Sequence, residues 1–332
     1  MAETVFVETA ARLHFGLLDL RGDLGRKFGG IGAAAPAPSL LLSAERAETV
    51  EASGPDAERA ADFARRFIEY LAARGEARRG VRLCVHRALP AHAGLGSGTQ
   101  LALAVARATA ELYGAPTYAA DLARAVDRAR RSAIGTWTFA GGGLVVEGGR
   151  AFDSAQGGRS ASDHVAPLVA RVPFPPSWRC VVAVPDVPPS ISGAAEAAAF
   201  DRLPPAPEHD VALVARLVLM RLLPAAAEGD LVTFGEAVTT IQTINGRWFR
   251  EVQGGTFAPG ISEELVRRMA EWGAAGVGQS SWGPAVYGIV GGDDDALRLA
   301  ERVRDTFDTS GVSGAVHAGA FRTEGARVWR PR

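Results

Sequence analysis

The apolar residues of this chain recur with two spacings, one typical of strands and one typical of helices. Alternating apolar and polar positions, or short apolar runs, predict strands over 4–20, 39–50, 81–89, 180–184, 285–290 and 314–321. Apolar residues three or four positions apart predict helices over 56–73, 101–113, 121–131, 210–226, 231–247, 262–273 and 294–307. The closing order of helix, strand, helix and strand predicts an α+β protein with layered sheets and helices.

Glycine and proline mark the segments between these elements. Residues 21–32 contain five glycines and three basic residues, and 276–283 is rich in glycine and serine, so the sequence predicts a loop and a turn there. Residues 203–207 predict a surface loop. A proline-rich stretch near 172–177 predicts a boundary between two domains, residues 1–172 and 173–332.

Composition narrows the class of protein. The chain has 332 residues, 47% of them hydrophobic and 22% charged, which is ordinary for a globular fold and long enough for two cores. The formal net charge of -1 gives no field that would attract nucleic acid or an acidic membrane. Cys84 and Cys180 lie in apolar runs and are expected to be buried, reduced thiols. The N-terminus resembles no secretory signal and the apolar runs are too short to span a bilayer, so we expect a cytoplasmic enzyme.

Lysine is almost absent from the chain. Of the 36 basic residues, Lys27 is the only lysine. Lysine is a compact point charge that suits a single phosphate or a titrating role, so we expect Lys27 to be functional rather than accidental.

The turn between the predicted strand 81–89 and the helix 101–113 is the clearest candidate site. It contains Gly94, Leu95, Gly96, Ser97, Gly98 and Thr99. Glycines allow close approach of the backbone to a phosphate, and a helix N-terminus offers unpaired N–H groups. The segment lacks the Gly-Lys-Ser/Thr of a P-loop and the G-x-G-x-x-G dinucleotide pattern. The alternative is a glycine turn closed by a serine cap.

Pro90-x-x-x-Gly-Leu-Gly-Ser97 before an Ala-rich helix resembles the phosphate-loop motif of the GHMP kinase superfamily, and residues 276–288 resemble its glycine-rich third motif. The resemblance implies a GHMP-kinase-like, two-lobed α+β fold. Its N-terminal lobe would be of the ribosomal-protein-S5-like type and its C-terminal lobe a ferredoxin-like α/β layer. Two features depart from the kinases: residues 132–139 contain no carboxylate that could act as a base, and Gly98 replaces a second serine.

These departures fit one branch of the superfamily. Residues 12–19, 94–100, 131–136, 253–255 and 278–283 together resemble the β-ribofuranosylaminobenzene 5'-phosphate synthase family. The resemblance implies a pentosyltransferase of tetrahydromethanopterin biosynthesis. It would join 4-aminobenzoate to phosphoribosyl pyrophosphate with loss of CO2 and pyrophosphate, use Mg²⁺, and form a homodimer.

Several residues are candidates for that chemistry near the N-terminus. Asp19 is expected to bind the metal, with a turn-forming aspartate as the alternative. Arg26 and Lys27 are expected to bind a phosphate or the benzoate carboxylate, against a solvated basic loop. His14, beside Arg12, is expected to donate a hydrogen bond to a sugar or phosphate oxygen, against a structural histidine.

Later segments supply further candidates for binding. Arg131, Ser132 and Thr136 stand where the kinases carry a base, and would bind an anionic phosphate group. Arg12, Gln279, Ser280, Ser281 and Trp282 would bind substrate, and Trp282 could stack on the aromatic ring unless it lies in the core. Arg124 and Arg128, one helical turn apart, predict a solvated helix face. The competing functions are an ATP-dependent kinase of the same superfamily and a sensor of a phosphorylated metabolite.

Overall fold

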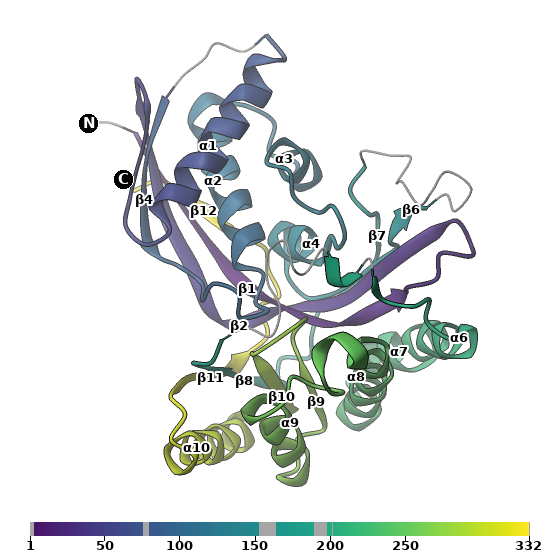
Figure 1. Ribbon diagram of the computed structural model, residues 1–332. Coiled ribbons are helices and arrows are strands. Elements are labelled where there is room, and N and C mark those ends of the chain that lie inside the picture. The colour runs from purple at the N-terminus through teal and green to yellow at the C-terminus, as the bar shows by residue number, and fades with distance from the viewer. Residues whose placement is uncertain (1–2, 76–79, 153–163, 189–197, 201, 332) are drawn as a thin grey trace.

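A computed structural model describes residues 3–75, 80–152, 164–188, 198–200 and 202–331 of the chain. The described elements form two sheets with helices packed on them, which confirms the predicted α+β class (Figure 1). The larger sheet and its helices belong mainly to the first half of the chain and the smaller sheet to the second half.

The larger sheet is built on a long antiparallel pair of strands, β1 (Thr4–Asp19) and β2 (Arg26–Ala47). Its main path runs in the order β12-β1-β2-β4-β3, and β5, β6 and β7 continue it alongside β2 and β5. The remaining strands are β3 (Val50–Ser53), β4 (Gly80–Arg87), β5 (Leu144–Glu147), β6 (Arg150–Ala151), β7 (Leu168–Val172) and β12 (Arg327–Trp329).

Helices α1 (Ala57–Ala72), α2 (Ser97–Tyr113), α3 (Ala119–Ala125) and α4 (Ile134–Gly141) lie on one face of this sheet (Figure 1). Alanine and leucine fill nearly every face of α2, and most of its side chains are buried, because it packs between the sheet, α1, α3 and α4. The phosphate-loop candidate leads directly into this central helix.

The smaller sheet has the order β11-β8-β10-β9, with all described pairs antiparallel. Its strands are β8 (Arg179–Pro185), β9 (Gly276–Gln279), β10 (Val286–Val290) and β11 (Gly314–Ala320). The helical elements described in this half include α6 (Glu208–Leu217), the π-helix η2 (Val218–Leu222), α7 (Leu223–Glu228), α8 (Leu231–Gln253), α9 (Ile261–Glu271) and α10 (Asp293–Ser310).

The two halves share one continuous apolar core. Phe15 of β1 contacts Phe234 of α8 and Tyr287 of β10, with ring centroids 6.5 and 5.0 Å apart. β12 returns from the second half to pair with β1, with Phe6 opposite Trp329. The division after residue 172 stays a prediction, and β12 crosses it. None of the helices in the described part of the chain is long and apolar enough to span a membrane.

Two sequence-based predictions about the first half are wrong. The glycine-rich segment expected to be a loop over 21–32 is strand from Arg26 onward. A methyl group on Gly32 would lie 2.4 Å from the Leu13 carbonyl oxygen and 2.5 Å from the Ile134 side chain. Glycine at position 32 therefore allows α4 to pack closely on strand β2. The expected helix over 121–131 ends at Ala125, and the unpredicted α4 follows it.

Candidate active site

The phosphate-loop candidate forms the entrance to α2. Gly94 and Gly96 have φ angles of 77° and 74°, the left-handed region that favours glycine, and Gly96 caps the helix. The amides of Ser97 and Gly98 have no hydrogen-bond partner among the described residues. Two N–H groups and the positive end of the α2 dipole are therefore available to an anion, and phosphate binding here stays a prediction.

A hydrogen-bonded junction holds this loop against β1 and the 280 turn. The Gly94 carbonyl accepts from Arg12 Nη1 at 2.9 Å and from Ser280 Oγ at 2.7 Å. Ser280 Oγ in turn accepts from the backbone N–H of His14 at 3.0 Å. A methyl group on Gly94 would lie 2.0 Å from the Ser280 carbonyl oxygen, so the junction admits only glycine there. Ser280 thus connects the two motifs, and its expected role in binding substrate stays a prediction.

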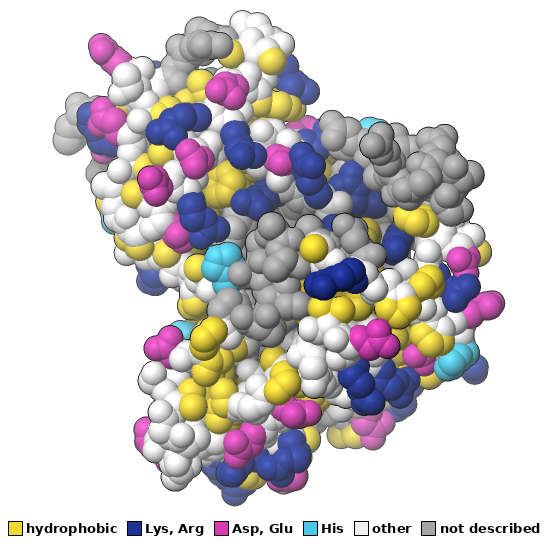
Figure 2. Space-filling model, in the orientation of Figure 1, with side chains coloured by type: hydrophobic (Ala, Val, Ile, Leu, Met, Phe, Trp, Pro, Cys, Tyr) yellow, Lys and Arg dark blue, Asp and Glu magenta, His cyan; other side chains and the backbone are white. Residues whose placement is uncertain are grey.

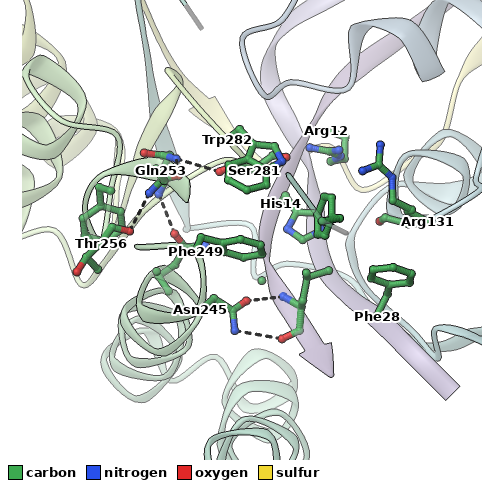
Figure 3. Close-up of a pocket in the computed structure, with 18 residues that line it drawn as sticks. Arg12, His14, Phe28, Arg131, Asn245, Phe249, Gln253, Thr256, Ser281 and Trp282 are labelled. Atoms are coloured by element: carbon green, nitrogen blue, oxygen red, sulfur yellow. Dashed lines mark hydrogen bonds between the residues drawn. The ribbon is translucent and has the colours of Figure 1, made fainter. Parts of the chain in front are cut away.

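A cavity of about 100 Å³ opens between the two halves beside this junction (Figure 3). Aromatic rings from four regions of the chain form part of its wall: Phe28, Phe200, Phe249 and Trp282. The Trp282 and Phe249 ring centroids are 4.9 Å apart, and those of Trp282 and Phe200 are 5.6 Å apart. We call these four residues the aromatic wall. Such a wall suits a flat aromatic or apolar ligand.

The charged groups of the cavity are basic. Arg12 and Arg131 line it, and its lining contains no Asp or Glu among the described residues. The Arg131 guanidinium lies 4.8 Å from the centre of the Phe200 ring, so it is held against the aromatic wall. A cavity with two guanidinium groups and an aromatic wall favours an aromatic anion.

His14 also lines the cavity and is buried. Its ring has no hydrogen-bond partner among the described residues. Burial, and secondarily the charge of Arg12, lower the pKa of His14 to about 3. The imidazole is therefore neutral at physiological pH and offers one donor and one acceptor to a ligand.

The amide side chains of the cavity are already occupied by structural hydrogen bonds. Asn245 accepts from the Leu17 N–H and donates to the Leu17 carbonyl. Gln253 donates to the carbonyls of Gly255 and Thr256, and accepts from Gln279. Asn245 and Gln253 fix the shape of the cavity (Figure 3). Gln279, expected to bind substrate, donates to Gln253 and to the Ser281 carbonyl and so belongs to the same network.

The remaining candidates near the N-terminus lie at the end of the β1–β2 pair where the 20–25 turn joins the two strands. Asp19 Oδ1 accepts from the backbone N–H groups of Arg21 and Gly22, which is the turn-forming arrangement. Arg26 donates to the carbonyls of Gly148 and Gly149. Lys27 Nζ lies 5.0 Å from the Phe152 ring centre and 5.8 Å from that of Phe28. None of the three lines the cavity, although Phe28 does.

The other predicted binding residues divide between the cavity and the core. Ser132 and Ser281 line the cavity beside Arg131 and Trp282. Thr136 is fully buried in α4 and does not line it. The Thr99 side chain packs against Gly135 of α4. A methyl group added to Gly135 would lie 3.0 Å from Thr99 Cγ2. The structure thus brings Arg12, His14, Arg131, Ser132 and Trp282 together.

Sequence reasoning missed two groups of residues at this site. Phe28, Phe200 and Phe249 are isolated aromatics with no motif, and only the fold brings them together. Arg59 and Arg128 lie beside the start of α2. The prediction that Arg128 lies on a solvated helix face is wrong, because α3 ends before it and its side chain is half-buried.

Comparison with known proteins identifies the family of this chain. Residues 61–142 match the family model for the GHMP kinases N terminal domain, and 222–309 match GHMP kinases C terminal. A β-ribofuranosylphenol 5'-phosphate synthase of Methanothermobacter thermautotrophicus is 33% identical over 97% of this chain and 99% of its own length. The Archaeoglobus fulgidus protein of the same name is 34% identical over 97% of this chain and 98% of its own. The chain belongs to the β-ribofuranosylphenol 5'-phosphate synthase family.

Solved structures place this family member on the GHMP kinase fold. Homoserine kinase from Cytophaga hutchinsonii superposes with a TM-score of 0.68 at 14% identity, covering 99% of this chain and 98% of that one. Mevalonate pyrophosphate decarboxylase from Streptococcus pyogenes has a TM-score of 0.64 at 14% identity, covering 97% and 98%. These structures confirm the predicted fold, and the matches to both GHMP kinase family models confirm the superfamily.

Proposed function

We propose that this chain joins a para-substituted benzoate, 4-aminobenzoate or 4-hydroxybenzoate, to phosphoribosyl pyrophosphate, with release of CO2 and pyrophosphate. The observation that carries this proposal is the cavity itself. It combines an aromatic wall with two arginines, has no acidic lining residue in the described chain, and is connected through Arg12 to the loop that begins α2. This is the environment that an aromatic carboxylate and a diphosphate need side by side.

The start of α2 would hold the diphosphate of the sugar substrate. The Ser97 and Gly98 amides donate to its oxygens, and the helix dipole offsets charge that builds up as the C1–O bond breaks. Arg12 lies between this loop and the cavity and already donates to Gly94. Sugar C1 would then face the cavity.

Magnesium fits this arrangement as an ion bound mainly by the diphosphate. Among the described residues, no three His, Cys, Asp or Glu side chains lie close enough together to form a metal site made of protein ligands alone. Mg²⁺ commonly binds through phosphate oxygens with only one or two protein oxygens. The Ser97 hydroxyl would be one of these. The ion would neutralise charge on the leaving group. Asp19, held in its turn, stays a predicted ligand.

The cavity would hold the aromatic acid. The aromatic wall packs on the ring while Arg131 binds the carboxylate, which places the carboxylate-bearing carbon opposite C1. The bond from C1 to diphosphate breaks and a bond from C1 to that ring carbon forms. The carbon–carboxylate bond then breaks, CO2 leaves, and its electron pair restores the aromatic ring. No side chain has to act as a strong base.

His14 would bind the substrate without changing its own charge. Its neutral ring faces the cavity, so it can donate to or accept from a sugar hydroxyl or the para substituent. Arg26 and Lys27 remain proposed to contact the 5'-phosphate from the turn end of the β1–β2 pair. Lys27 neighbours Phe28 of the aromatic wall, which supports a position near the substrate.

We also propose that the protein functions as a homodimer. Leu219 and Met220 of η2 and Val232 of α8 are 60%, 70% and 63% exposed. These two elements pack together, so the three side chains support an apolar contact surface. A monomer mass in sedimentation equilibrium at micromolar protein would contradict this assignment.

The decisive assay combines purified protein, Mg²⁺, phosphoribosyl pyrophosphate and carboxyl-labelled 4-aminobenzoate or 4-hydroxybenzoate, and counts labelled CO2. Release that requires both substrates and no ATP supports the proposed reaction. Folded protein that releases none, but consumes ATP with a small alcohol, would be a kinase of the superfamily. Binding of phosphorylated metabolites without any turnover would instead identify a sensor.

A further inference from the structure

Two arginines from different elements converge at the start of α2. A methyl group on Gly98 would lie 3.0 Å from Nη2 of Arg59 and 3.6 Å from Nη2 of Arg128. Arg59 comes from α1, whereas Arg128 follows the end of α3. Because Gly98 has no side chain, both guanidinium groups lie in the space that a side chain there would border. Neither arginine lines the aromatic cavity, so this is a second cationic position.

The backbone around Arg128 is held in an unusual conformation. Asp127 and Ala129 have φ angles of 57° and 63°, in the left-handed region that non-glycine residues rarely adopt. The Arg128 N–H donates to the Ala123 carbonyl at 2.7 Å, which closes the turn after α3. This turn directs the side chain toward α2 rather than into solvent.

The Arg128 side chain is half-buried. Its guanidinium lies 4.7 Å from the Phe63 ring centre, and its buried Nε atom has no hydrogen-bond partner in the described chain. Burial, and next the charge of Arg59, lower the pKa of Arg128. Two like charges held together beside a helix N-terminus are unfavourable unless an anion joins them.

Nearby carboxylates do not fully neutralise the positive charge of Arg128. Asp56 forms an ion pair with Arg59 at 3.0 Å. Asp127 forms ion pairs with Arg66, at 3.7 Å, and with Arg130. Each carboxylate is thus already bound to another arginine, which leaves Arg128 with excess positive charge. Figure 2 shows several basic side chains on this part of the surface, over α1 and α3.

We propose that Arg59, Arg128 and the amides of Ser97 and Gly98 form a phosphoryl subsite that binds the terminal phosphate of the diphosphate. The assignment rests on the proposed function and deepens it, because it separates the leaving group from the arginines of the aromatic cavity. Arg12 lies between the two positions, on the Gly94 side of the loop. The released pyrophosphate would stay bound at this subsite after the sugar has left.

Isothermal titration with inorganic pyrophosphate and Mg²⁺ tests the subsite without requiring turnover. Arg128→Met keeps an apolar stem over Phe63 but removes the charge. We expect it to weaken pyrophosphate binding at least tenfold, and Arg59→Gln to weaken it less, since Arg59 has its own acidic partner. Arg124→Met is the matched control. This substitution also removes one positive charge, but from α3, where Arg124 pairs with Asp121. The variant should bind pyrophosphate with wild-type affinity.

Gly98→Ala gives a second test that keeps both charges. Gly98 lies in the first turn of α2 and has no left-handed φ, so alanine suits the helix. Its methyl group would occupy the space between the guanidinium groups and the amides. Pyrophosphate binding should fall while the melting temperature holds or rises. Wild-type pyrophosphate affinity in folded Arg128→Met or in Gly98→Ala would overturn the subsite.

Steady-state kinetics separate this proposal from the proposed function. With an active enzyme, Arg128→Met should raise the KM for phosphoribosyl pyrophosphate at least tenfold and leave that for the aromatic acid within about twofold. An equal rise in both KM values would overturn the subsite. If the wild type releases no CO2 but binds pyrophosphate through Arg128, the proposed function fails and the subsite stands.

Discussion

Glu147 is a buried carboxylate that should make the stability of this protein depend on pH. It ends β5 and is fully buried, and its two oxygens accept from the N–H groups of Gly149, at 2.7 Å, and Ala133, at 3.3 Å. Ala133 follows the cavity residues Arg131 and Ser132 directly. Burial outweighs these hydrogen bonds and raises the pKa of Glu147 from 4.5 to about 7.

The size and sign of the effect follow from this pKa. Between pH 4.5 and 7 the folded protein keeps a proton on Glu147 that the unfolded chain has released. This contribution to stability is complete below pH 4.5 and is lost as the pH rises through 7. Since a tenfold change in proton affinity equals about 1.4 kcal/mol, the loss between pH 5 and 8 amounts to about 2–3 kcal/mol.

Glu147→Gln removes the titration and keeps the shape of the side chain. We expect the free energy of unfolding of this variant, relative to wild type, to increase by about 2–3 kcal/mol between pH 5 and 8. Urea denaturation at half-unit steps of pH measures both curves. Glu228→Gln, at an exposed position of α7, is the matched control and should follow wild type. Parallel curves for Glu147→Gln and wild type would refute the reasoning.

Three further predictions concern the site. Because the pKa of His14 is about 3, imidazole NMR signals of His14 should not titrate between pH 5 and 8, and a midpoint in that range would contradict its burial. Gly94→Ala should lower the free energy of unfolding by at least roughly 2 kcal/mol in urea denaturation, since the methyl group meets the Ser280 carbonyl. Gly114→Ala is the control, because Gly114 has a similar φ of 68° but a methyl group there would meet no atom within 4 Å. It should lower the free energy of unfolding by only about 1 kcal/mol. Lys27→Ala should lower kcat/KM in the CO2 assay at least about tenfold without unfolding the protein, whereas unchanged activity would remove Lys27 from the site.

Regular amphipathic elements were predictable from the sequence. The helix expected over 56–73 is α1, Ala57–Ala72, because its buried residues recur at helical spacing. The same rule fails for α4. Residues 134–139 are all buried, so this short helix has no polar face that could reveal its period. The expected helix over 210–226 is instead three consecutive pieces, α6, η2 and α7.

The site was predictable only where one segment carries the chemistry. The loop from Gly94 to Thr99 could be read locally, since glycine, hydroxyl groups and a helix start follow one another. The aromatic wall could not, because Phe28, Phe200 and Phe249 come from separate elements that meet only in the folded chain. Arg128 was misjudged because its position depends on a turn between two left-handed residues, which the sequence does not mark.

The return of β12 to β1 affects how the chain can fold as it is made. β1 leaves the ribosome before every other described strand, and β12, its partner in the sheet, follows the whole second half. At about 5–20 residues per second, roughly 15–60 s separate the synthesis of the two strands. Until then the outer edge of β1 lacks this partner and could pair with another chain. A nascent chain stalled before β12 should therefore be a target for chaperones, even with the phosphate loop already formed.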